Sequence, residues 1–190
     1  LDPILSIAAA LDFKDPFLMP LGKEKQVDAR KSELCNGWKS DHLLLYNVLH
    51  EYECRENYDA YQFCRENFLC ISTLKQLKKM KTQFMEHLQE MNFVDSTDFK
   101  DPAFNCNSYN ISLIKAIVCA GLYPNIGVIR KTKKHYFAHV VDGGKINWHP
   151  KSVLSQLKDF QPSLFVYFVL LQSSSKYVHD ATVIPPLPAV

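Results

Sequence analysis

The chain has 190 residues, of which 47% are hydrophobic and 22% are charged, the balance of an ordinary globular protein. This composition excludes an intrinsically disordered chain. The longest apolar run, residues 164–171, is too short for a membrane span of about 20 residues, so we expect no membrane partner. The sequence opens on Leu1-Asp2-Pro3 without a signal segment, and we expect a fragment of a longer protein.

Basic side chains are concentrated in one window, although the formal net charge is only +2. Residues 130–151 hold six lysines and arginines against the single acid Asp142, which gives this window a charge of +5. Clustered positive charge is typical of surfaces that bind nucleic acid or another polyanion. Four more lysines, at positions 75, 78, 79 and 81, lie on a predicted helix, where a solvated face is the simpler interpretation.

The six cysteines do not predict a disulfide framework. Several lie in apolar helical contexts, such as Cys119 within residues 116–120, where a free cysteine behaves as a small hydrophobic residue. A chain of this length can also fold without disulfides, so we expect a reducing, intracellular compartment.

The first hundred residues predict helices with little strand signal. The expected helices cover residues 4–11, 23–34, 43–53, 58–68 and 72–91. The last of these has the clearest period, with one apolar face formed by Leu77, Met80, Phe84, Leu88 and Met91. Residues 95–107 are rich in Asp, Ser, Thr, Asn and Pro and predict a linker, after which one more helix is expected over 111–120.

Beyond residue 125 the pattern changes to short strands. We expect strands over 126–131, 135–141, 145–149, 164–171 and 176–183, with a tight hairpin turn at Asp142-Gly143-Gly144. Five short strands after a helix fit a small barrel of the OB (oligonucleotide/oligosaccharide-binding) type. The predicted fold class is therefore α+β, with a helical domain over residues 1–98 and a barrel domain with a leading helix over 99–190.

No catalytic or metal-binding motif is present in the sequence. It lacks a GxxxxGK[ST] phosphate loop, a GxSxG elbow and an HExxH pair, so we expect no enzyme activity, no catalytic residue and no cofactor in this chain. No CxxC occurs, and His135 and His139 would lie about 13 Å apart on a strand, too far to share a metal. Ser40, Asp41 and His42 are the residue types of a hydrolase triad. Because neighbours in sequence cannot converge, we interpret them as the start of a helix, with His42 facing a space between domains.

The basic hairpin is the strongest candidate site. Three ammonium groups, an imidazole and a phenol lie in or beside one tight turn: Lys131, Lys133, Lys134, His135 and Tyr136. Lysines neutralise phosphates and aromatic rings stack on unpaired bases, and His149, Lys151 and Ser152 are expected on the same rim. An acidic protein partner, or a turn that only keeps a strand edge soluble, fits the same residues.

Ordered motifs along the whole chain resemble the C-terminal region of the DEAH/RHA helicases. The opening LDPILSIAA is similar to the LDPxLxIAA stretch of their helicase-associated region, and Ser40-Asp41-His42-Leu43 to their SDHL motif. Residues 115–124 resemble the start of their OB-like domain, and residues 148–153 its HPxSV element. Residues 20–25 and 29–31 are most similar to the branch that resolves G-quadruplexes and is associated with AU-rich elements.

This resemblance implies the function of a longer protein. Two RecA-like domains, outside this chain, would use ATP and Mg²⁺ to move 3′-to-5′ along single-stranded RNA or DNA. A winged helix, the helical "ratchet" of residues 1–98 and the OB-like domain would then cap the strand channel. The implied partners are single-stranded RNA or DNA, G-quadruplexes, and the RecA-like core and winged helix of the same polypeptide, in a cytoplasmic and nuclear protein. The alternative function is a platform that docks an acidic or glycine-rich regulator of a helicase.

The chain departs from the family pattern in its longest predicted strand. Phe165 takes the place of a usual tryptophan, and Phe168 that of a usual histidine. The Pro-rich residues 184–188 are also unlike the aromatic ending of related sequences.

Overall fold

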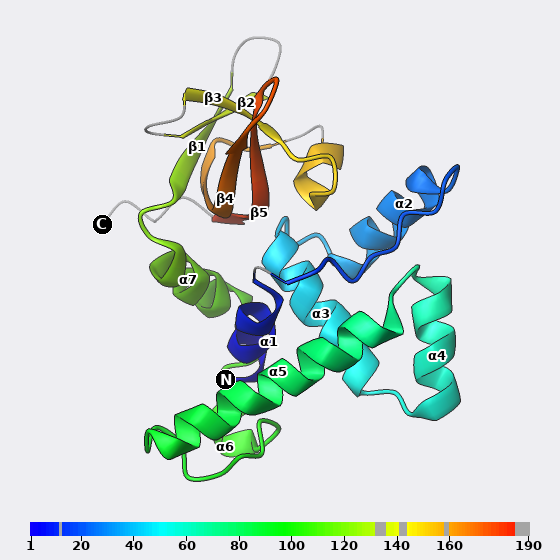
Figure 1. The fold of residues 1–190 in the computed structure, drawn as a ribbon. Helices are drawn as coiled ribbons and strands as arrows, with labels where there is room; N and C mark the ends of the chain where they lie inside the picture. Colours follow the sequence, from blue (N-terminus) through cyan, green and yellow to red (C-terminus); the bar gives the residue numbers. More distant parts are fainter. Residues whose placement is uncertain (12, 132–135, 141–143, 158–159, 185–190) are drawn as a thin grey trace. The chain divides into compact units, whose positions relative to one another are not determined.

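Helices occupy the first two thirds of the chain and strands the last third in the computed structural model (Figure 1). The structure describes all residues except 12, 132–135, 141–143, 158–159 and 185–190. Two compact units result: a helical unit, Leu1–Asn36 and Leu43–Ile114, and a barrel unit, Gly37–His42 and Lys115–Val190. The expected α+β class, a helical region followed by an OB-like barrel, is confirmed.

The helices begin and end close to the predicted positions. They are α1 (Asp2–Ala10), α2 (Glu24–Leu34), α3 (Asp41–Glu53), α4 (Asn57–Glu66), α5 (Ile71–Glu90), a short α6 (Pro102–Asn105) and α7 (Ile111–Leu122). Pro3 lies in the first turn of α1, where its missing N–H would have had no helical partner. No helix among the described residues combines the length and the apolar character needed to cross a bilayer.

The buried face of α5 matches the predicted one only in part. Of the five residues expected on it, Leu77 is buried, the next three are half-buried, and Met91, just beyond the helix, is 56% exposed. The buried residues of this helix are Thr73, Leu74, Leu77, Lys81 and Met85. A hydrophobic period could not include Lys81, which is fully buried because its ammonium contacts the carboxylates of Asp2 in α1 and Glu53 in α3.

The proline-punctuated segment between α1 and α2 is held to the segment that precedes α5. Phe17 and Leu69 form an antiparallel bridge, flanked by hydrogen bonds from Leu18 N to Phe68 O (2.7 Å) and from Cys70 N to Pro16 O (2.8 Å). These backbone bonds explain how residues 16–18 keep an extended course in an otherwise helical unit.

The boundary between the units differs from the expected one near residue 98. Residues 99–114 belong to the helical unit, because Asn105 Oδ1 accepts a 2.9 Å hydrogen bond from Asp2 N and the Phe99 ring lies 4.2 Å from Lys81 Nζ. The polar composition of residues 95–107 suggested a linker, but these contacts tie the segment to α1 and α5.

Five strands close the barrel in the order β1-β2-β3-β5-β4. They are β1 (Ile126–Lys131), β2 (Tyr136–Val140), β3 (Gly144–Trp148), β4 (Ser163–Gln172) and β5 (Lys176–Ile184), and a 3-10 helix, η1 (Val153–Gln156), follows β3. All pairs of neighbouring strands are antiparallel except β3 and β5, which run parallel with Trp148 opposite Val178. The predicted hairpin turn over residues 142–144 can be checked only at Gly144, whose φ of 71° is the positive value expected there. Residues 142–143 lie outside the described part of the chain.

Candidate nucleic-acid interface

One end of the barrel carries a lysine beside an aromatic ring. Lys131 ends β1 and Tyr136 begins β2, and the two residues are paired across the strands. The Lys131 ammonium lies 5.4 Å from the centre of the Tyr136 ring, a distance at which the cation is attracted to the ring face. Lys133, Lys134 and His135 were expected in the same turn and lie outside the described residues.

Three aromatic rings gather at this end of the barrel. The Trp148 and Phe160 rings are stacked with centres 5.8 Å apart, and the Tyr136 ring meets Phe160 edge-on at 6.4 Å. The rings border a hollow of about 220 Å³, which Lys145 and Asn147 also line. Tyr136 and Trp148 are half-buried, whereas Phe160 is buried behind them. The two half-buried rings, next to lysines, form a surface on which unpaired bases can stack while ammonium groups meet the phosphates.

This surface rests on a close approach of two strands. A Cβ at Gly127 in β1 would collide with the Phe165 ring of β4 and lie 2.8 Å from the carbonyl oxygen of His139. Phe165 is fully buried and meets Trp148 edge-on with ring centres 4.8 Å apart. The absence of a side chain at Gly127 therefore lets Phe165 fill the barrel and support the Trp148 ring.

The other predicted basic residues follow β3. The His149 ring stacks on His179 of β5 with ring centres 3.7 Å apart, and its Nδ1 accepts a 3.2 Å hydrogen bond from Lys151 N. Burial lowers the pKa of His179, and the Lys151 ammonium lowers it further, against the opposing effect of Asp41. Lys151 is exposed, so its ammonium can meet a phosphate in solution.

Ser152 has a role within the barrel unit. It is only 6% exposed, and its hydroxyl donates a 2.6 Å hydrogen bond to Asp41 Oδ2. Ser152 Oγ also accepts a 3.1 Å hydrogen bond from Leu154 N at the start of η1. A nucleic-acid contact by this hydroxyl would require these bonds to break. We therefore leave Ser152 out of the interface.

Asp41 joins the segment 37–42 to the barrel. Its carboxylate is buried and accepts three hydrogen bonds, from Ser152 Oγ (2.6 Å), Val153 N (2.8 Å) and Ala181 N (3.0 Å). Hydrogen bonds to a charged group are the stronger kind, and here they fix both η1 and β5. Asp41 is the first residue of α3, as expected, and its carboxylate also holds the barrel.

Ser40 and His42 support the same junction through Thr182. The hydroxyls of Ser40 and Thr182 lie 2.6 Å apart, and His42 Nδ1 lies 2.7 Å from the Thr182 hydroxyl. The expectation that His42 faces a space between domains is wrong, since the residue is only 1% exposed and its ring contacts β5. Burial lowers the pKa of His42 to about 4, so the ring is neutral near pH 7.

Lys115 completes the attachment of this segment. Its ammonium donates hydrogen bonds to the carbonyl oxygens of Trp38 (2.7 Å) and Val183 (2.9 Å), while Val183 N donates to Lys39 O (3.0 Å). Residues 37–42 therefore belong to the barrel unit although residues 43–114 separate them from its other segment.

Sequence reasoning missed part of the aromatic surface. The sequence indicates Trp148 only as part of a motif and Lys145 only as a charge, and it does not indicate Phe160. The alternation along β3 could have placed Trp148 on the same barrel face as Ile146, because side chains two apart on a strand share a face. No pattern in the sequence indicates that Phe160, twelve residues further on, returns to stack on it.

Comparisons with known proteins match both units. The model of the "Oligonucleotide/oligosaccharide-binding (OB)-fold" family matches residues 114–190, and that of the "Helicase associated domain (HA2), ratchet-like" family matches residues 1–45. The OB match begins within one residue of the start of the long segment of the barrel unit.

Curated helicases match almost the whole chain. The human "ATP-dependent DNA/RNA helicase DHX36" is 44% identical over 98% of this chain, and the Arabidopsis thaliana "DExH-box ATP-dependent RNA helicase DExH1" is 33% identical over 95%. The mouse "Putative ATP-dependent RNA helicase DHX57" is 29% identical over the full chain. The chain spans about a fifth of the length of these relatives, 19%, 18% and 16% respectively.

Proposed function

The chain belongs, through its ratchet-like and OB-fold regions, to the C-terminal module of the DEAH/RHA helicases, and on this premise we propose that its barrel binds a single strand of RNA or DNA. The observation that carries the proposal is the aromatic hollow of Tyr136, Trp148 and Phe160, which Lys145 also lines, with the Lys131 ammonium over the Tyr136 ring. Rings accept any base by stacking and lysines accept any phosphate, so the interface needs no particular sequence.

Within a complete helicase, this module would cap the channel through which the strand passes. The resemblance of residues 20–25 and 29–31 to the G-quadruplex-resolving branch extends the proposal to G-quadruplexes. ATP hydrolysis with Mg²⁺ would take place in RecA-like domains outside this chain, and the module would contribute strand binding.

The salt dependence of binding tests this proposal. A fluorescent single-stranded dodecanucleotide would be titrated with the 190-residue chain between 50 and 200 mM salt. Each lysine that neutralises a phosphate contributes about one unit to the slope of log K against log salt concentration. Lys131→Gln with Lys145→Gln should therefore make the slope shallower by about two units, whereas Lys100→Gln, on the helical unit, should leave it unchanged.

Two results would refute the proposal. One is a binding constant that does not respond to salt, because a phosphate interface must release counterions. The other is equal weakening by Lys100→Gln and by the barrel substitutions, because a general loss of charge would then account for both. Displacement of an acidic protein partner by the oligonucleotide would show that such a partner shares the surface.

A further inference from the structure

A hollow of about 460 Å³ lies along α4 in the helical unit, at residues that the barrel interface does not use. Four of its lining residues belong to α4, where spacings of three and four residues place them on one side of the helix: Tyr58, Tyr61, Gln62 and Arg65. Both tyrosines are exposed, Tyr58 by 73% and Tyr61 by 55%. The hollow is therefore open to solvent and accessible to a macromolecule.

A segment with three exposed aliphatic side chains borders this hollow. Leu18, Met19 and Leu21 are 47%, 39% and 97% exposed. Both ends of the segment are held to Phe68, which lines the hollow. Leu18 N donates a 2.7 Å hydrogen bond to Phe68 O, and the Lys23 ammonium lies 5.8 Å from the centre of the Phe68 ring. The aliphatic side chains are therefore fixed next to the aromatic side chains of α4.

A tight turn presents Leu21 to solvent. Lys23 N donates a 3.1 Å hydrogen bond to Pro20 O, and Gly22 has a φ of 77° at the third position of the turn, where glycine is favoured. Gly22 N also donates a 3.1 Å hydrogen bond to Glu24 Oε1. Because the turn is already ordered, a partner that covers Leu21 gains the burial of this side chain without the cost of ordering the loop.

Two cations on different segments flank the exposed rings. Lys23 and Arg65 are both exposed, and neither forms a salt bridge with another residue of the described part of the chain. Glu66, the one acid among the described lining residues, accepts a 2.8 Å hydrogen bond from the Gln62 amide. The hollow therefore attracts an occupant that carries carboxylates.

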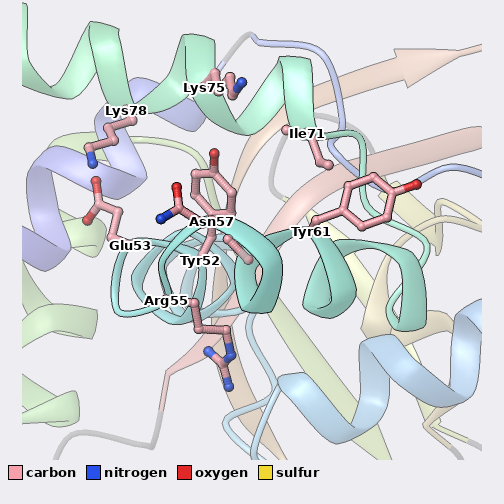
Figure 2. Close-up of a pocket in the computed structure, with 9 residues that line it drawn as sticks. Tyr52, Glu53, Arg55, Asn57, Tyr61, Ile71, Lys75 and Lys78 are labelled. Atoms are coloured by element: carbon pink, nitrogen blue, oxygen red, sulfur yellow. The ribbon is translucent and has the colours of Figure 1, made fainter.

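The Tyr61 ring is not committed to the lysines of the neighbouring helix. Figure 2 shows its hydroxyl directed away from Lys75 and Lys78 of α5, with which it lines a second, smaller hollow. Its helix is anchored from the opposite side by the buried Phe63 and Cys64. A tyrosine on a fixed helix offers a large contact area at little cost in conformational entropy, which is why such residues are frequent anchors of protein interfaces.

We propose that residues 18–23, together with Tyr58, Tyr61 and Arg65, form a docking face for an acidic amphipathic segment of another protein. Aliphatic side chains of this segment would cover Leu21 and pack on the Tyr61 ring, and its carboxylates would meet the two cations. The aliphatic side chains of the docking face favour a protein over a nucleic acid. Phosphates and bases would satisfy the cations and the rings, but they would leave the exposed aliphatic groups without an apolar cover.

A designed peptide tests this proposal. The probe is a fluorescein-labelled peptide of four Glu-Leu-Leu-Glu repeats, titrated with the 190-residue chain and followed by anisotropy, and we expect saturable binding. Two matched peptides separate the contributions. Glutamine in place of every glutamate removes the charge, and alanine in place of every leucine removes the apolar side. Each matched peptide should bind about tenfold more weakly, or worse.

The two cations are tested by a charge variant. Lys23→Gln with Arg65→Gln should weaken the binding of the peptide by about tenfold and make it less sensitive to salt. Lys79→Gln, at an exposed lysine of α5 that lines neither hollow, is the control and should leave the binding unchanged.

Two further substitutions test the apolar contacts. Tyr61→Ala and Leu21→Ser should each weaken the binding of the peptide by about fivefold or more. Tyr109→Ala and Leu171→Ser, at residues that are 89% and 51% exposed outside the docking face, are the controls and should have no effect. All the substituted side chains are exposed, so we expect every variant to keep the fold.

Four results would overturn the inference. They are no saturable binding of the Glu-Leu-Leu-Glu peptide, equal weakening by the control variants, undiminished binding of the alanine peptide, and a loss of dodecanucleotide binding in Lys23→Gln with Arg65→Gln that leaves the peptide unaffected. The last result would assign the docking face to nucleic acid. Lys131→Gln with Lys145→Gln should leave the binding of the peptide unchanged, so a failure of the barrel interface and a failure of this inference can be distinguished.

Discussion

The Asp41 carboxylate accepts a 2.6 Å hydrogen bond from the Ser152 hydroxyl, although 111 residues separate the two in sequence. The same carboxylate binds the backbone of η1 and β5, so a residue at the start of a helix also anchors a β-barrel. The motifs SDHL and HPxSV therefore meet in one buried hydrogen-bond network.

Loss of the Asp41 charge should destabilise the barrel. Asp41→Ala leaves the donors Ser152 Oγ, Val153 N and Ala181 N without this acceptor. We expect the free energy of unfolding to fall by about 3 kcal/mol or more. Ser152→Ala removes one of the three bonds and should cost about 1 kcal/mol. Urea denaturation of the two single variants and of the double variant measures these losses in the free energy of unfolding. Strictly additive losses would contradict a shared network, because groups in contact are expected to couple.

The stability should also depend on the protonation of His42. Its pKa is lowered to about 4 in the folded chain by burial, against about 6.5 in the unfolded chain. The unfolded state therefore binds more protons between these values. The stability that the neutral His42 contributes to the folded chain is therefore complete above pH 6.5 and is lost as the pH falls toward 4. The loss in the free energy of unfolding is at most about 3 kcal/mol.

Denaturation at pH 7, 5.5 and 4.5 measures this loss. The His42→Gln variant should show a shallower fall in stability than the native chain, and His139→Gln, which changes an exposed histidine, should follow the native curve. Identical pH dependence in the native chain and His42→Gln would show that His42 does not carry the effect.

Two glycines offer a matched pair of substitutions. Gly127→Ala places a methyl group against Phe165 and should cost about 1–3 kcal/mol by overpacking. Gly121→Ala lies in α7 with open space around the added carbon and should stabilise the chain by up to about 1 kcal/mol. Melting temperatures of the two variants should therefore move in opposite directions, and a shift in the same direction would refute the packing argument.

Lys81 should be indispensable to the helical unit. Its substitution by methionine would leave the Asp2 and Glu53 carboxylates without their buried cation, and breaking such a pair costs about 3–5 kcal/mol. Lys79→Met, at an exposed position two residues away, should change the stability by no more than about 0.5 kcal/mol. Equal denaturation midpoints for the two variants would contradict the buried role of Lys81.

The sequence predicted the elements better than the contacts between them. Helices and strands follow from local period and turn residues, and the expected strand 126–131 coincides with β1. The buried side of α5 was predicted only in part because its central residue, Lys81, is charged, and its burial depends on carboxylates 79 and 28 residues away. Local patterns contain no information about such distant partners.

The candidate site was predicted in the same partial way. Lys131 and Tyr136 were recognised because they flank a turn, and the structure brings them together across β1 and β2. Phe160 could not be found, since its stacking on Trp148 depends on the path of the chain between β3 and β4. The burial of Ser152 could not be predicted for a related reason, as its partner Asp41 comes from the first turn of α3, far away in the sequence.

The fluorescence of Trp148 tests the central claim most directly. The chain has two tryptophans, so Trp38→Phe leaves Trp148 as the only indole, within the proposed interface. We predict that a single-stranded dodecanucleotide quenches this fluorescence saturably, with the same dissociation constant as an anisotropy titration, and that Lys131→Gln with Lys145→Gln weakens both signals together. Binding seen by anisotropy with no change in Trp148 fluorescence would contradict the account.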